Sequence, residues 1–84
     1  MPESINTNYY EVYLVRFIKE AIANSDGSNY GIAQYLSEIK IGRWFVPHKI
    51  EQKRALADAQ QAFEGHRHWP RNIIFSHLGI TVPE

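Results

Sequence analysis

The chain contains no cysteine among its 84 residues. This absence excludes a disulfide framework, a thiolate metal site and catalysis through a cysteine nucleophile. The sequence also lacks a run of about 18 apolar residues, the length that a membrane-spanning helix requires. The first ten residues, MPESINTNYY, do not have the basic and then apolar pattern of a secretory signal. We therefore expect a cytoplasmic protein with no membrane segment.

The chain also has no net charge, because its nine Lys and Arg residues balance its nine Asp and Glu residues. Dedicated nucleic-acid-binding proteins usually carry a positive excess, so the overall balance counts against that class. The distribution along the chain is uneven. Residues 1–39 carry a net charge of −3, residues 40–54 carry +4 and residues 55–84 carry −1. The middle segment is the part of the sequence that would attract a polyanion.

Apolar residues are plentiful, at 44% of the chain, and aromatic residues make up 13%. Apolar side chains recur at helical spacing in four segments, which predicts helices over about 8–24, 28–42, 47–65 and 70–79. We expect one domain over residues 1–84, mostly α, built as a compact bundle of about four helices. The predicted core residues are Tyr10, Leu14, Phe17, Ile18, Ala21, Ile32, Tyr35, Leu36, Ile39, Leu56, Ala59 and Phe63.

Capping signals support the outer ends of the first and last helices. Asn8 can accept from a first-turn amide, with Glu11 reaching back in the manner of a capping box. Gly79 is suited to the left-handed conformation that ends a helix in a Schellman motif. That motif would fold Ile80 back toward Phe75.

Two prolines mark the predicted starts of the third and fourth helices. Pro47 and Pro70 suit the first helical position, where an N–H would have no partner in any case. We further expect Phe45 to pack on Ile50 across the start of the third helix, as a hydrophobic staple.

An α+β fold is the alternative. The segments RWFV (43–46) and GITV (79–82) are β-branched or aromatic and are bounded by Gly or Pro, so they could pair as two short strands. The domain would then be similar to a small winged helix.

The segment YGIAQYLSEIKIGRWFVPHKIEQKR, residues 30–54, indicates a helix-turn-helix-like unit that binds duplex DNA. An apolar-striped helix with a small Ala33 precedes a helix with a cationic start, which would enter the major groove. The predicted turn between these two helices is longer than the three or four residues of a tight helix-turn-helix motif. The predicted base contacts and phosphate contacts are Lys40, Arg43, His48, Lys49, Gln52, Lys53 and Arg54.

Protein binding is the rival function, in which the chain is a small inhibitor or adaptor that blocks or links a larger partner. The first helix carries more apolar surface than one neighbour would cover, and large aromatic residues are common interface anchors. The predicted interface residues are Tyr9, Val12, Val15, Tyr30, Trp44 and Trp69. The first three would also serve a homodimer formed through the first helix.

Catalysis and metal binding are not expected. His66 and His68 are two residues apart and His77 follows, but no Cys or Asp stands beside them, and this is a weak pattern for zinc. No Gly-rich phosphate loop or nucleophile elbow is present. We therefore expect no enzyme, no metal and no cofactor, and a regulatory or accessory role in DNA binding comes first among the functions.

Overall fold

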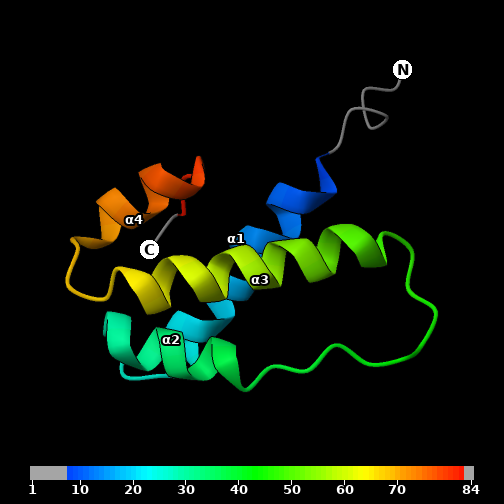
Figure 1. The fold of residues 1–84 in the computed structure, drawn as a ribbon, viewed down its shortest axis with the longest axis horizontal. Coiled ribbons are helices and arrows are strands. Elements are labelled where there is room, and N and C mark those ends of the chain that lie inside the picture. The colour runs from blue at the N-terminus through cyan, green and yellow to red at the C-terminus, as the bar shows by residue number, and fades with distance from the viewer. Residues whose placement is uncertain (1–7, 83–84) are drawn as a thin grey trace.

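The computed structural model describes residues 8–82, which form four helices and no strand (Figure 1). The helices are α1 (Tyr9–Ala23), α2 (Asn29–Ser37), α3 (Lys49–Gly65) and α4 (Arg71–Leu78). The predicted α-helical bundle is confirmed. The alternative with a two-stranded sheet is wrong. Residues 43–46 lie in the loop before α3, whereas residues 79–82 lie beside α4 at the other end of the molecule, so the two segments cannot pair.

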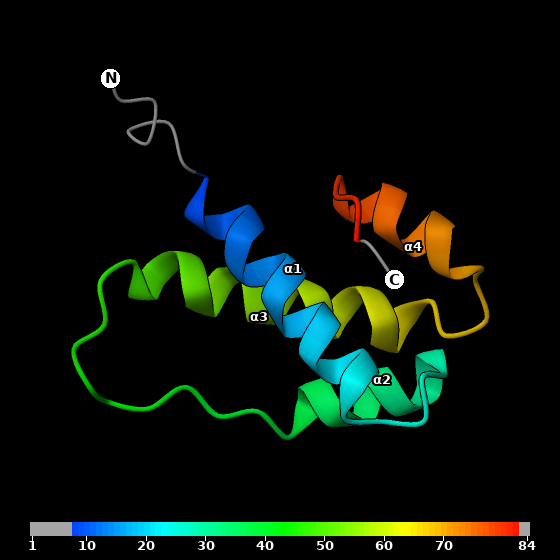
Figure 2. The same cartoon turned by 180° about the vertical axis from the view of Figure 1, so that it is seen from behind.

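Helix α3 is the central element, because it packs against each of the other three helices. Figure 2 shows α1 crossing α3 on one side, with α2 alongside the C-terminal half of α3. The side chains between them form a single apolar cluster. Its largest fully buried members are Phe63, Leu14, Ile18, Ile32, Leu36 and Ile74.

Small residues on α3 let the neighbouring helices approach closely. Ala55 and Ala59 are completely buried, and Ala62 is 4% exposed. Each places a methyl group where a larger side chain would push α1 or α2 away, and alanine also has the highest helix propensity. The AxxxA spacing thus serves both the formation of α3 and its packing.

The predicted caps hold at the start of α1 and the end of α4, and the start of α2 is capped as well. The Asn8 side chain accepts from the Glu11 amide at 3.2 Å, and the Ser28 hydroxyl accepts from the Gly31 amide at 3.0 Å. At the end of α4, Gly79 has φ of 75° and its amide donates to the Ser76 carbonyl at 3.0 Å.

The backbone after Gly79 completes the predicted Schellman motif. The Ile80 amide donates to the Phe75 carbonyl at 3.1 Å, and both side chains are buried. The two hydrogen bonds satisfy carbonyls that the last turn of a helix leaves without partners.

The boundaries around the 38–48 connection differ from the prediction. α2 ends at Ser37 rather than near Gly42, because the amides of residues 38 and 39 donate to carbonyls only three residues back and tighten the last turn. α3 begins at Lys49, behind His48 in the left-handed conformation with φ of 65°. Pro47 is therefore not the first residue of the helix.

Two further details of helix entry were predicted wrongly. Phe45 does not staple onto Ile50, since these side chains are 91% and 79% exposed. Pro70 is the N-cap of α4, with an extended ψ of 145°, rather than its first helical residue.

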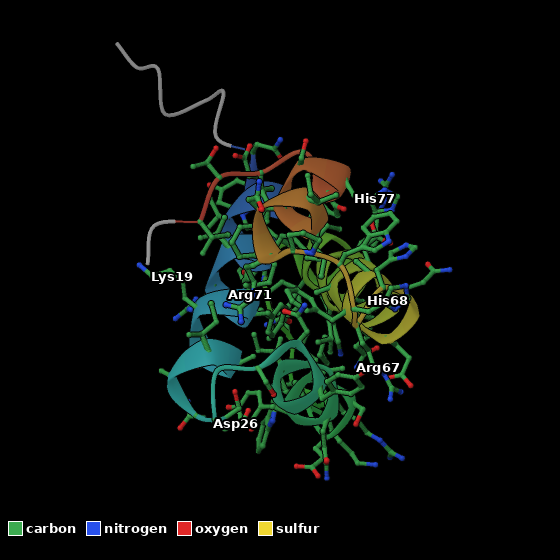
Figure 3. All side chains as sticks on the ribbon, turned by 90° about the vertical axis from the view of Figure 1, so that its left-hand side faces the viewer. Lys19, Asp26, Arg67, His68, Arg71 and His77 are labelled. Atoms are coloured by element: carbon green, nitrogen blue, oxygen red, sulfur yellow. The ribbon has the colours of Figure 1, made fainter. Side chains whose placement is uncertain are left out.

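A polar clamp joins the connection between α1 and α2 to the connection between α3 and α4. The Asn29 amide group donates to the carbonyls of Arg67 and Trp69, at 2.9 and 2.8 Å. Its oxygen accepts from Nε of Arg71 at 2.8 Å, and Arg71 also donates to the Gly27 carbonyl. Figure 3 shows Arg71 pointing inward between α4 and this loop. The clamp fixes the direction in which α4 leaves α3.

Candidate contact surface

The largest exposed apolar side chains lie around the eleven-residue connection 38–48 and the start of α3. Trp44 is 79% exposed, Phe45 is 91% exposed and Ile50 is 79% exposed. Figures 1 and 2 show why: α2 lies along the C-terminal half of α3, so the first turns of α3 extend past it and the connection loops back around that end. Exposed apolar groups gathered in this way are typical of a binding surface.

Four predicted cations lie in the same part of the chain. Lys40 and Arg43 are exposed in the connection, while Lys49 and Lys53 are four residues apart and share one side of α3. None of the four forms an ion pair within residues 8–82, where the one salt bridge joins Arg67 to Glu64. We call these four cations, together with Trp44, Phe45 and Ile50, the loop surface.

The other three predicted DNA contacts point elsewhere. Arg54 is turned toward α1, where its guanidinium lies 5.4 Å from the centre of the Tyr10 ring. The Oε1 atom of Gln52 is buried and has no hydrogen-bond partner among the described residues. His48 is stacked on Tyr9, with ring centres 3.6 Å apart. Arg54 and His48 therefore each contact a ring of α1, although both side chains remain exposed.

The Trp44 indole is supported from one side although most of it is exposed. A Cβ atom added to Gly42 would lie 2.6 Å from Cδ1 and Nε1 of the indole, so the ring rests directly against the Gly42 backbone. The Lys49 ammonium donates to the Trp44 carbonyl at 3.4 Å and ties the connection to α3. A residue with a Cβ atom at position 42 would therefore displace the indole from this position.

The predicted protein-interface residues do not form one surface. Tyr9 and Val12 are 39% and 49% exposed near the start of α1, and Val15 is partly buried against the core. Tyr30, 59% exposed, lies on α2 with the Arg67 guanidinium 5.5 Å from its ring centre. The last two aromatics of the set are far apart in the fold, with Trp69 packed against the core beside α4 and Trp44 in the loop surface.

A cleft that the sequence did not suggest lies between α1, α3 and α4. It is an open cleft of about 340 Å³ whose lining includes Tyr10, Asp58, His66 and His77. The Tyr10 hydroxyl donates to the Asp58 carboxylate at 2.5 Å. Burial raises the pKa of Tyr10 to about 12, and the hydrogen bond to Asp58 acts in the same direction. No pattern in the sequence links positions 10 and 58, because only the packing of α1 on α3 brings them together.

Two of the three histidines weighed for zinc do meet at this cleft. The rings of His66 and His77 are 5.2 Å apart between centres, and Trp69 stacks on His66 at 3.8 Å. His68 has no ring contact with them in the described part of the chain. Within residues 8–82, no group of three or more His, Asp or Glu is arranged to hold a metal ion.

Comparison with known proteins adds no functional information: no family model, no curated protein and no solved structure matches this chain. None of the four helices in residues 8–82 combines the length and the apolar character needed to cross a bilayer.

Proposed function

We propose that this chain is a small DNA-binding accessory protein that acts without catalysis and uses the loop surface for contact. The observation that supports the proposal is the set of four cations, Lys40, Arg43, Lys49 and Lys53, none of which has an acidic partner among residues 8–82. Unpaired cations keep their field for an external polyanion. We also propose that the protein acts in the cytoplasm and has a regulatory role.

The mode of binding is not a tight helix-turn-helix. Eleven residues separate α2 from α3, against the three or four of that motif. Arg54 and His48 contact rings of α1, and the Gln52 oxygen is buried. Affinity in this proposal comes mainly from phosphate contacts made by the loop surface, which position the protein without reading sequence.

The test is the binding of fluorescein-labelled DNA at about 50 mM salt, followed by anisotropy. Replacing Arg43, Lys49 and Lys53 together by Ala should abolish most of the affinity. If four phosphates are neutralised, log K should fall with log salt at a slope of about −3.6 for a duplex or about −2.8 for a single strand. The matched control is Arg16→Ala with Lys19→Ala, which removes exposed cations from α1; Lys19 lies at the edge of the molecule in Figure 3.

The control should bind like the wild type. An equal loss of DNA affinity in both variants would mean that the binding is general charge attraction and does not use the loop surface. The absence of any DNA binding at low salt would refute the proposal.

A protein-binding module, such as an inhibitor or adaptor, is the second candidate. The exposure of Ile50 supports it, because an aliphatic side chain that is 79% exposed would gain from an apolar pocket on a partner. This function predicts a co-purifying protein that Ile50→Ala releases and that moderate salt does not. DNA binding predicts instead that moderate salt releases the bound ligand and that Ile50→Ala does not.

Dimerisation through α1 is a further part of the proposal. Tyr9 and Val12 are exposed near the start of the helix and Val15 is partly buried, so two copies could pack along this face. Sedimentation equilibrium of the wild type and of Val12→Lys tests it. A monomer at all concentrations would refute it.

A further inference from the structure

We infer that the form of DNA bound at the loop surface is single-stranded, with Trp44 and Phe45 stacking on unpaired bases while the neighbouring cations hold phosphates. The inference rests on the proposed function and names its substrate class. It follows from the placement of aromatic and cationic side chains in one short segment.

The first step is the exposure of two aromatic rings between cations. Trp44 and Phe45 are 79% and 91% exposed, and Lys40, Arg43 and Lys49 lie within five residues of them along the chain. Duplex DNA hides its base faces inside the stack and offers such rings little to contact. A single strand exposes base faces beside its phosphates, and aromatic stacking on those faces contributes about 1–3 kcal/mol per base.

The second step is the support of the indole. Trp44 rests against the backbone of Gly42, and its own carbonyl accepts from Lys49 at 3.4 Å. A ring held in this way loses less conformational freedom on binding than a ring on a free loop. The rest of the indole surface faces solvent and is available to a base.

The third step concerns the duplex alternative. Reading the major groove needs polar side chains aimed outward from the first turns of α3. In this helix the Gln52 oxygen is buried and Ile50, an apolar residue, is 79% exposed. The polar side chains that the helix start keeps for DNA are Lys49 and Lys53, which hold phosphates in this proposal, whereas the exposed rings of the loop suit base faces.

The fourth step favours DNA over RNA. A protein distinguishes ribose from deoxyribose by hydrogen bonds to the 2′-hydroxyl. The residues beside the two rings in the chain are Arg43 and Val46, and neither side chain carries an oxygen that could accept from the 2′-hydroxyl. The Arg43 donors serve phosphates in this proposal, so the strand that we assign is DNA, as in the proposed function.

The experiment compares labelled oligo(dT), oligo(U) of the same length and a duplex of matched length by anisotropy at about 50 mM salt. We expect oligo(dT) to bind at least about tenfold tighter than the duplex, which corresponds to about 1.4 kcal/mol. We expect oligo(U) to bind no tighter than oligo(dT). In a Trp69→Phe background, where Trp44 is the one tryptophan left, oligo(dT) should also quench the tryptophan emission.

Three variants locate the contact. Trp44→Ala should weaken binding of oligo(dT) by about fivefold to about a hundredfold, the range given by the loss of one stacked base. Gly42→Ala should also weaken it, because the added methyl group displaces the indole while every charge and every aromatic residue stays. The matched control is Tyr30→Ala, which removes a ring 59% exposed on α2 and should leave the affinity unchanged.

The outcomes separate this inference from the function on which it rests. Equal or tighter binding of the duplex, or no effect of Trp44→Ala, would overturn the single-strand inference and leave DNA binding standing. Tighter binding of oligo(U) by about tenfold or more would overturn the choice of DNA. Absence of binding to every oligonucleotide would refute the proposed function itself. Circular dichroism of each variant checks that the helices are intact.

Discussion

The polar clamp at Asn29 predicts a large loss of stability when this one side chain is truncated. Asn29→Ala removes the two hydrogen bonds donated to the carbonyls of Arg67 and Trp69 and the one accepted from Arg71. The loops that these bonds join are about forty residues apart in the chain, so no local interaction replaces them.

The magnitude follows from the three bonds. Each neutral hydrogen bond contributes about 0.5–1.5 kcal/mol, and one to a charged group about 1.5–3 kcal/mol. The site is only partly buried, so water can reach some of the freed groups, and alanine gains about 0.5 kcal/mol in helix propensity at the start of α2. We therefore expect a net loss of about 2 kcal/mol. For a domain of this size the Tm should fall by about 8–16 °C.

The assay is urea unfolding followed by circular dichroism, with Trp69 fluorescence in a Trp44→Phe background as a local probe. The Trp69 carbonyl loses its partner in Asn29→Ala, so the emission of this tryptophan should change before global unfolding. Asn72→Ala is the control, since Asn72 is exposed on α4 and makes no comparable contact in the described part of the chain. A loss below about 0.5 kcal/mol, or equal loss in both variants, would refute the clamp.

Three further predictions concern other parts of the fold. The pKa of Tyr10 is raised from 10.0 to about 12, which means that the folded state favours the neutral phenol. The neutral phenol therefore contributes to the stability of the fold below pH 10, and this contribution is lost as the pH rises toward 12. Ultraviolet titration of wild type against Tyr10→Phe should show one late-titrating tyrosine that the variant lacks, and five tyrosines titrating together would contradict it. Gly79→Ala should cost about 1–2 kcal/mol in urea unfolding, because φ of 75° is strained for alanine although the added methyl group meets no atom within 4 Å. Phe45→Ser should leave the free energy of unfolding within about 0.5 kcal/mol of the wild type, as expected for a ring 91% exposed, and a larger loss would show that the ring packs on the fold.

The proposed surface was only partly predictable from the sequence. The charge count over residues 40–54 located the cations, and Trp44, which the sequence analysis named as an interface residue, is exposed. The sequence placed Gln52 and Arg54 on the same surface as Lys49 and Lys53, but the structure turns Gln52 inward and Arg54 toward Tyr10. Helical spacing gives the angle between side chains; it does not say which direction a neighbouring helix occupies.

Periodicity and capping signals by themselves determined that the chain forms four helices, most of the residues that these helices bury, how α1 begins and how α4 ends. These are local properties, since an apolar stripe, an Asn N-cap and a Gly in the left-handed region act over one or two turns. Tertiary structure alone decided that Ile50 and Phe45 face solvent, that Asn29 joins two distant loops and that Tyr10 meets Asp58. Each of these depends on whether another helix is present at that point in space. α2 does not reach along α3 as far as its first turns, which are left uncovered. The spacing of residues within either helix does not determine how far the two overlap.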